Sequence, residues 1–165
     1  MTYFAWLEET GFSIWIRESE WGFFLILTLH SLSMGLAVGI NLAVNLRIIG
    51  FANRVPLHLM QKFYPLMQYA LIIIFLSGTL LLIAYPAKAL TNSIFYLKIV
   101  CILAALLITH NFSQQLLSKP ANSLTLPSNK FKLLAVLSIA LWVTVITSGR
   151  FLAYTHSILL ASSFY

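Results

Sequence analysis

The sequence predicts an all-α membrane protein, a four-transmembrane-helix up-down-up-down bundle with a short N-terminal amphipathic interfacial segment. Hydrophobic residues make up 60% of the chain and charged residues 8%, and the mean hydropathy is +0.90. A soluble domain carries roughly a quarter charged residues, so this chain lacks the charges to cover a globular surface in water. Four long apolar runs account for most of its length.

The first twenty residues mix aromatic and acidic side chains. Trp6, Phe12 and Trp15 stand among Glu8 and Glu9, a pattern typical of a helix lying on a membrane surface; a loose tail is the alternative. The acidic residues and the lack of a basic start argue against a signal peptide, so we expect the first apolar run to be an uncleaved anchor. We therefore divide the chain into an interfacial segment, residues 1–20, and a transmembrane domain, residues 21–165.

Each apolar run is long enough to cross a membrane as a helix, since roughly 20 residues span the hydrocarbon core. An open sheet would leave backbone groups unpaired in lipid. Short connections make sequential helices antiparallel neighbours. Pro56 is a plausible first residue of the second helix, and Asn92 or Ser93 could cap the third. The expected helices cover residues 21–46, 63–85, 95–117 and 131–154.

The basic residues predict how the helices are oriented. Six of them lie in or beside the first and third connections, against four on the opposite side. The positive-inside rule then places these two connections in the cytoplasm and both termini outside. The six are Arg47, Arg54, Lys62, Lys119, Lys130 and Lys132, and the four are Arg17, Lys88, Lys98 and Arg150.

The remaining composition excludes several functional classes. The net charge of +6 does not indicate nucleic-acid binding, because the basic residues stand at the ends of apolar runs, where they meet lipid headgroups. Cys101 is the only cysteine, so there is no intrachain disulfide and no cysteine metal cluster. No zinc-protease, phosphate-loop, dinucleotide-binding or nucleophile-elbow motif occurs. Whether the protein is an enzyme stays open.

Small residues recur at every fourth position of the first apolar run. Gly35 and Gly39 form a GxxxG motif, which Ser31 and Ala43 extend at the same spacing. Such a stripe lets another helix approach closely. We therefore expect this face of the first helix to pack against a neighbouring helix.

A second stripe on the first helix is polar and begins with a histidine. His30, Met34, Asn41 and Asn45 fall near one helical face, and His30 lies about 13 Å below the outer boundary. Its imidazole either bonds to a neighbouring helix or contacts a metal, a haem or a quinone. His110 lies about 9 Å deeper, so one haem could join the two histidines only if the helices were staggered.

The fourth helix carries an arginine one to two turns from its outer end. Arg150 shares a face with Thr147 and Tyr154. It either extends to the outer headgroups, or pairs with an anionic ligand or with Glu18 or Glu20 at the start of the first helix. The pairing requires the first and fourth helices to be neighbours, as in a closed four-helix bundle.

Three stretches resemble a bacterial family of small four-helix inner-membrane proteins, a domain of unknown function. They are IRESEWGFFLILTLHSL at 16–32, NLRIIG at 45–50 and GRFLAY at 149–154, and the resemblance covers about residues 12–154. It implies a multi-pass protein of the bacterial inner (cytoplasmic) membrane and no established activity. With the orientation above, both termini are periplasmic. The motif residues are Arg17, Glu18, Ser19, Trp21, His30, Arg47, Asn92, Lys98, Gly149, Arg150 and Tyr154.

These observations favour a membrane subunit of a redox or metal-handling assembly, with an outer-side polar site and with haem b, quinone and copper all open as cofactors. The alternative is a non-catalytic scaffold or interaction subunit of a larger membrane complex. A transporter is disfavoured because the core lacks acidic residues for a proton relay. Expected partners are membrane lipids and other membrane subunits or further copies of this chain. The expected site residues are His30 as ligand or hydrogen-bond partner, Arg150, Lys98 and Arg17 as cations for an anionic group, Glu18 as counter-ion, and Tyr154.

Overall fold

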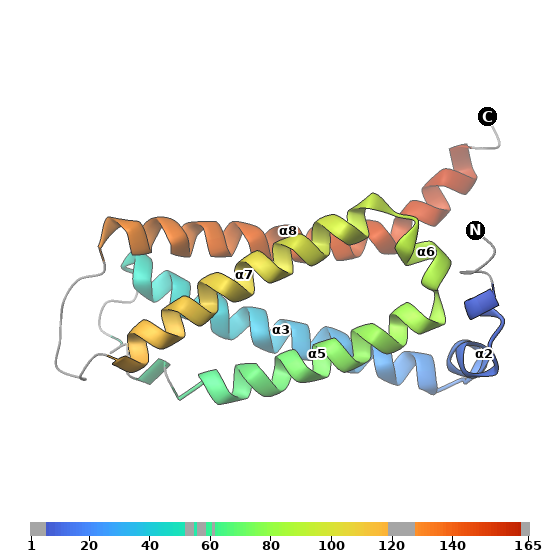
Figure 1. Cartoon of the computed structure of the whole chain (residues 1–165), viewed down its shortest axis with the longest axis horizontal. Helices are drawn as coiled ribbons and strands as arrows, with labels where there is room; N and C mark the ends of the chain where they lie inside the picture. Colours follow the sequence, from blue (N-terminus) through green and yellow to red (C-terminus); the bar gives the residue numbers. More distant parts are fainter. Residues whose placement is uncertain (1–5, 52–54, 56–58, 61, 119–127, 163–165) are drawn as a thin grey trace.

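The computed structural model describes residues 6–51, 55, 59–60, 62–118 and 128–162, and their side chains except those of 115–118 and 153–162. These residues form helices and short connections, and the described ranges contain no strand. Figure 1 shows the helices in chain order. They are α2 (Gly11–Glu18), α3 (Gly22–Ile49), α5 (Tyr64–Ala84), α6 (Pro86–Leu90), α7 (Ser93–Ser118) and α8 (Asn129–Ser162).

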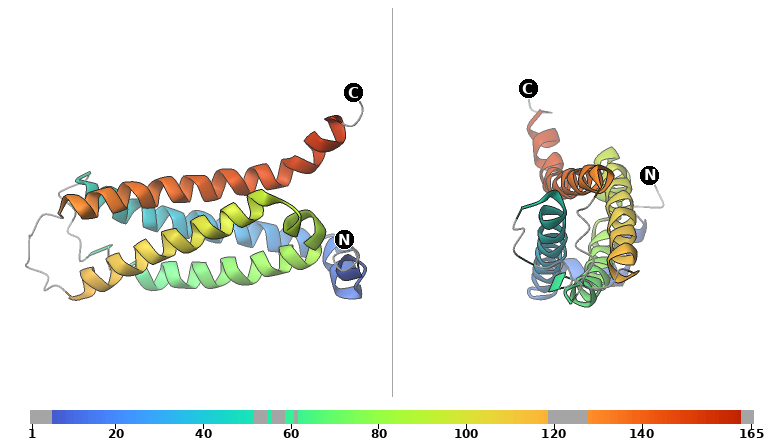
Figure 2. Two further views of the ribbon diagram at one scale, coloured as in Figure 1. Left: turned by 45° about the horizontal axis from the view of Figure 1, so that its top comes forward. Right: turned by 90° about the vertical axis from the view of Figure 1, so that its left-hand side faces the viewer.

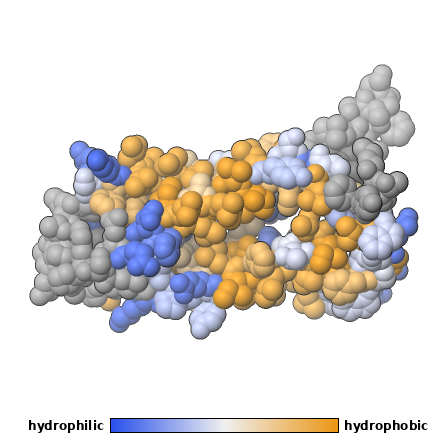
Figure 3. Space-filling view, in the orientation of Figure 1, coloured by the Kyte–Doolittle hydropathy of each residue, from blue (hydrophilic) through white to orange (hydrophobic). Residues whose placement is uncertain are grey.

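Four of the described helices are long and apolar enough to cross a membrane. The spans are Gly22–Ile49, Tyr64–Ala84, Ser93–Gln114 and Asn129–Leu152. Apolar side chains cover the middle of the face drawn in Figure 3, and hydrophilic residues gather toward the two ends. The protein is therefore an all-α, multi-pass membrane bundle, as the sequence predicts, and its exposed apolar side chains fit contact with lipid.

The helix bounds differ from the predicted ones by a few residues, except that α8 continues to Ser162. The sequence did not predict α6, which lies within the second connection. Asn92 caps α7 as expected: its Oδ1 accepts a hydrogen bond of 2.9 Å from the backbone N–H of Ile94. Gly50 ends α3 with a φ of 115°, a left-handed conformation that glycine adopts without a Cβ clash. Pro56 lies outside the described residues.

The spanning helices alternate in direction and surround a common interior, as the end-on view of Figure 2 shows. The closely packed pairs are α3 with α5, α7 with α8, and α3 with α8. The expected neighbourhood of the first and fourth helices is therefore confirmed. By contrast, α5 and α7 spread apart toward α6 in both side views (Figures 1 and 2). We call the end of the bundle that carries α2 and α6 the α6 end.

Helix α3 is the central helix, because it packs against both α5 and α8. Its buried residues recur every three or four positions and so define one inner face. An apolar cluster of Ala37, Tyr64, Met67 and Ala70 joins α3 to α5. The buried residues of α3 are His30, Ser33, Ala37, Asn41, Val44, Asn45 and Ile48.

The expected packing at the GxxxG motif is wrong for helices within this chain. Gly35 and Gly39 are exposed, and a Cβ built on either would meet no atom within 4 Å. The inner face of α3 is the polar one instead. Because α3 is apolar almost all round, its hydrophobic pattern could not distinguish the buried face from the face that meets lipid.

Helix α2 lies against the end of α5 and has two unlike sides. The Ser13 hydroxyl donates a hydrogen bond of 3.3 Å to the carbonyl of Ala84, and Ile16 is fully buried. Phe12 and Trp15 are exposed and stack on each other with 6.2 Å between ring centroids. This segment is amphipathic, as the sequence predicts, with its aromatic side free to enter the membrane interface.

Candidate functional site

His30 lies in the interior of the bundle and is bonded to the next helix. Its side chain is 9% exposed, and Nδ1 stands 2.9 Å from the hydroxyl oxygen of Ser77 on α5. At 1.5 Å per residue, His30 lies about 12 Å along α3 from its first residue, Gly22. Of the two alternatives that the sequence leaves open for His30, the hydrogen bond to a neighbouring helix is therefore present.

The hydroxyl of Ser77 determines which ring nitrogen of His30 carries the proton. Ser77 donates its single proton to the backbone carbonyl of Ile73, at 2.6 Å, and it also lies 3.3 Å from the carbonyl of Ile74. With its proton directed to the backbone, the hydroxyl accepts from His30, so Nδ1–H is the donor. Nε2 then carries the lone pair of the ring, and the imidazole makes a further contact with the backbone of Ile74 on α5. This tautomer is the one that offers Nε2 to a ligand.

Lys98 approaches His30 from α7. Its ammonium is close enough to the imidazole to act on it electrostatically, and Nζ lies 3.6 Å from the place that a Cβ on Gly149 of α8 would occupy. A Cβ on Gly78 of α5 would likewise lie 3.2 Å from Cε1 of His30. Gly78 thus makes room for the imidazole, whereas a Cβ at Gly149 would meet Lys98 at an ordinary contact distance. We call His30, Ser77 and Lys98 the His30 site.

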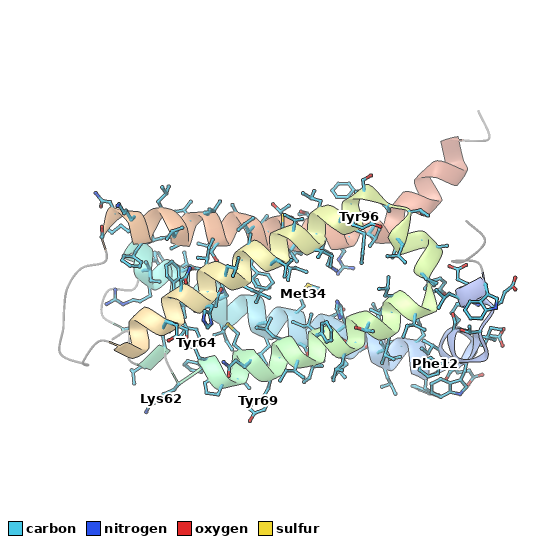
Figure 4. The ribbon with its side chains drawn as sticks, viewed as in Figure 1. Phe12, Met34, Lys62, Tyr64, Tyr69 and Tyr96 are labelled. Carbon is cyan, nitrogen blue, oxygen red and sulfur yellow. The ribbon has the colours of Figure 1, made fainter. Side chains whose placement is uncertain are left out.

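The His30 site combines an acceptor with a cationic donor. Nε2 of neutral His30 can only accept a hydrogen bond, and the ammonium of Lys98 can only donate. No carboxylate among the described residues forms an ion pair with Lys98. Met34, one turn from His30 on α3, is seen between α5 and α7 in Figure 4. The site can therefore hold a ligand that presents one donor and one acceptor.

Arg17 makes its contacts with residues outside the His30 site. Its Nη2 donates a hydrogen bond of 2.5 Å to the carbonyl of Glu8, and its guanidinium lies 5.8 Å from the ring centroid of Tyr85. The carboxylate of Glu8 in turn accepts a bond of 3.2 Å from the backbone N–H of Ala87. These contacts tie the N-terminal segment to the junction of α5 and α6. None of them involves His30 or Lys98.

Two other predicted site residues, Arg150 and Glu18, are not brought together among the described residues. Arg150 and Glu18 are both exposed, and no ion pair joins them in the part of the chain that the structure describes. Helices α3 and α8 pack together where Val44 and Ile48 meet Ala135, toward the opposite end of the bundle. At the α6 end the two helices lie apart (Figure 1), so both side chains are left to solvent or headgroups. The side chain of Tyr154 lies outside the described residues, although its backbone belongs to α8.

The described residues bring no second histidine to His30. His110 is exposed on α7, and no three His, Cys, Asp or Glu side chains group together within the described ranges. His58 and the side chain of His156 lie outside them. The described donor set at His30 is therefore one imidazole, one hydroxyl and one ammonium.

A second polar cluster lies deeper in the bundle and is uncharged. Asn41 donates a hydrogen bond of 2.5 Å to the hydroxyl of Thr109, and Asn45 donates one of 3.0 Å to the hydroxyl of Ser138. The cluster thus joins α3 to α7 and α8. Asn45 Oδ1 is buried and has no partner. At 1.5 Å per residue, Asn41 lies about 16 Å along α3 from His30, so the two clusters are separate.

Sequence reasoning missed Ser77, Gly78 and the contact of Gly149 with Lys98. A serine or glycine in an apolar run does not by itself indicate a functional site, because both residues are common in membrane helices. Only the partner 47 residues away in sequence gives Ser77 its role. The one available hint was that a buried histidine in lipid requires a polar neighbour.

Comparison with known proteins supplies the family. The family model DUF6644, a family of unknown function, matches residues 3–155. No curated protein and no solved structure matches the chain. The resemblance to an uncharacterised family that the sequence shows agrees with this match. The chain belongs to the DUF6644 family of unknown function.

Proposed function

We propose that this protein is a membrane subunit of a redox assembly and that it binds a cofactor or substrate at the His30 site. The observation that supports this most is the arrangement of His30 itself. Ser77 fixes the ring through Nδ1 at 2.9 Å, and the Lys98 ammonium acts on the ring electrostatically. The packing of α3 against α5 uses Nδ1 and leaves the acceptor Nε2 and the cation Lys98 for a further group.

The donor set favours an organic ligand among the three cofactors that the sequence leaves open. Copper takes several nitrogen or sulfur donors, and haem b in membrane proteins is held by two axial side chains. No three His, Cys, Asp or Glu side chains group together within the described residues, and His30 and Met34 lie one turn apart on the same helix. Copper or haem b would therefore need ligands from elsewhere. A quinone needs only hydrogen-bonding groups for its oxygens, and Nε2 and Nζ are such groups.

We also propose how the protein is oriented in the membrane. The α6 end faces the periplasm, both termini lie on that side, and the protein resides in a bacterial inner membrane. The excess of Lys and Arg at the opposite end supports this. Accessibility of terminal tags in intact spheroplasts tests it, and protection of both tags would contradict it.

The test of function is the content of the purified protein. Wild type, His30→Leu and the control Thr144→Ala should be compared by visible absorption, metal analysis and mass spectrometry of an organic extract. Thr144 lies in α8 and bonds to its own helix at 2.9 Å, away from His30. We expect wild type and the control to carry a near-stoichiometric ligand that His30→Leu lacks. Wild type without any ligand, metal or chromophore would refute the proposal.

The alternative is a scaffold or interaction subunit, and two observations favour it. The cluster around Asn41 and Asn45 joins three helices without any charge. The small-residue stripe at Gly35 and Gly39 is exposed, where another membrane subunit or a second copy could approach closely. A ligand-free protein that still folds and co-purifies with other membrane subunits would establish this alternative.

A further inference from the structure

We infer that the ligand of the His30 site is a quinol, which binds between His30 and Lys98 and extends its apolar tail into lipid between α5 and α7. This inference rests on the proposed function and names the ligand class of the same site. It has three parts: the chemistry of the ligand head, its redox state, and the route by which it enters.

The head must present a donor to His30 and an acceptor to Lys98. Nε2 carries a lone pair, because the ring proton stays on Nδ1, which donates a hydrogen bond of 2.9 Å to the Ser77 hydroxyl. An anionic headgroup would suit Lys98, but its oxygens would face that lone pair, acceptor against acceptor. A hydroxyl suits both positions, since it donates to Nε2 and its oxygen accepts from Nζ. A ring with hydroxyls on opposite sides can reach two groups that come from different helices.

This pairing distinguishes the reduced from the oxidised ligand. A quinol has two hydroxyls, and both His30 and Lys98 find a partner. An oxidised quinone has only carbonyl oxygens, so Lys98 is satisfied and Nε2 is not. A site built to bond a hydroxyl rejects an analogue that lacks it, because a buried polar group is left unpaired. The His30 site therefore prefers quinol to quinone.

The arrangement of the helices gives the ligand a lateral route. The close pairs are α3 with α5, α7 with α8, and α3 with α8, so the side between α5 and α7 is the least closed. These two helices spread apart toward α6 (Figures 1 and 2), and the surface between them is hollowed there (Figure 3). The hollow leads toward α3, which carries His30.

The exposed surfaces of α5 and α7 are apolar at these levels. Phe75 and Leu76 on α5 are 73% and 58% exposed, and Leu97 and Val100 on α7 are 51% and 63% exposed. At 1.5 Å per residue, Lys98 lies about 8 Å along α7 from its first residue, Ser93. A ligand that reaches this depth from the side passes through hydrocarbon, and it needs an apolar tail to remain there.

The test is a titration of ligand-depleted protein in lipid nanodiscs with a benzoquinone that carries a ten-carbon tail. The probe is added oxidised or anaerobically reduced, and calorimetry measures the two Kd values. We expect the quinol to bind roughly tenfold more tightly, as one buried hydrogen bond predicts. His30→Leu should remove this preference, and Lys98→Met should weaken both forms by about tenfold. Lys130→Met, an exposed lysine at the other end, is the matched control.

Three outcomes would overturn the inference. Equal Kd values for the two forms would show that Nε2 accepts no hydroxyl. Tighter binding of oleate than of the quinol would assign the site to an anionic lipid. Failure of both forms to bind, in a wild type whose extract or spectrum contains another ligand, would overturn the quinol and leave the proposed function standing. Melting curves of each variant verify that it folds.

Discussion

His30 on α3 and Ser77 on α5 are joined by a hydrogen bond of 2.9 Å between Nδ1 and Oγ. The bond links α3 to α5, which are a closely packed pair of helices. It holds the imidazole in one orientation and one tautomer, so that the second nitrogen is directed elsewhere. The consequences for ligand binding can be separated from those for stability by single substitutions.

Ser77→Ala should weaken ligand binding while the fold survives. The substitution removes the acceptor of the Nδ1 proton, which frees the ring to rotate or change tautomer. A net hydrogen bond of about 0.5–1.5 kcal/mol predicts a loss of roughly 2- to 10-fold in affinity. Thr79→Ala is the control, since Thr79 lies on the same helix and bonds only to the carbonyl of Phe75, at 2.9 Å. Equal losses in both variants would contradict a specific role for Ser77.

Gly78→Ala should impair the site more than Gly149→Ala does. The new Cβ at Gly78 would stand 3.2 Å from Cε1 of His30, which forces the ring to shift, whereas at Gly149 it would stand at an ordinary 3.6 Å from Nζ of Lys98. Alanine is favoured over glycine within a helix by roughly 0.5–1 kcal/mol, so neither variant should melt much earlier. Ligand titration beside thermal melting measures both effects. A greater loss at Gly149 would show that the ring is not confined as described.

Gly39→Leu should leave the stability of the detergent-solubilised protein almost unchanged, within about 0.5 kcal/mol. A side chain there meets no atom of this chain within 4 Å. Gly78→Leu is the contrasting variant, because overpacking against His30 should cost about 1–3 kcal/mol. Thermal melting compares the two. A clear drop for Gly39→Leu would mean that this stripe contacts another helix, in a second copy or in a partner.

Asn41→Leu should destabilise the bundle by about 1–2 kcal/mol, the upper part of the range for hydrogen bonds between membrane helices. The substitution removes the bonds of Asn41 to Thr109 and Asn45. Asn111→Leu is the control, because Asn111 is exposed on α7. Unfolding in a denaturing detergent mixture reports both. If the two variants unfold alike, the cluster does not hold α3 to α7.

The membrane fold was predictable because length and apolar composition leave a helix in lipid few alternatives. The cap at Asn92 and the two-sided α2 were predictable for the same kind of local reason: side-chain chemistry next to a helix start, and aromatic residues mixed with charges. The depth of His30 along α3 also followed from counting residues. None of these required knowledge of which helices touch.

The side-chain contacts between helices depended on which face each helix turns toward the interior. A sequence that is apolar on all sides does not indicate that face. The pattern at Gly35 and Gly39 predicted a packed face, yet that face is exposed. Helices α3 and α8 are neighbours, but they lie apart at the α6 end (Figure 1) and the side chains of Arg150 and Glu18 are exposed. The neighbourhood of the two helices therefore did not yield the predicted ion pair. Ser77 acquires its meaning only from the packing of α5 against α3.

The most direct test of the account is nitrogen NMR of protein whose four histidines carry labelled imidazoles, with the His30→Leu variant to assign the signal of His30. We predict a single neutral tautomer with the proton on Nδ1, an Nε2 that is unprotonated without ligand, and a shift of the Nε2 signal when the ten-carbon quinol is added. The Nε2–H tautomer, or an Nε2 signal that no ligand moves, would contradict the claim that His30 offers this nitrogen to a ligand.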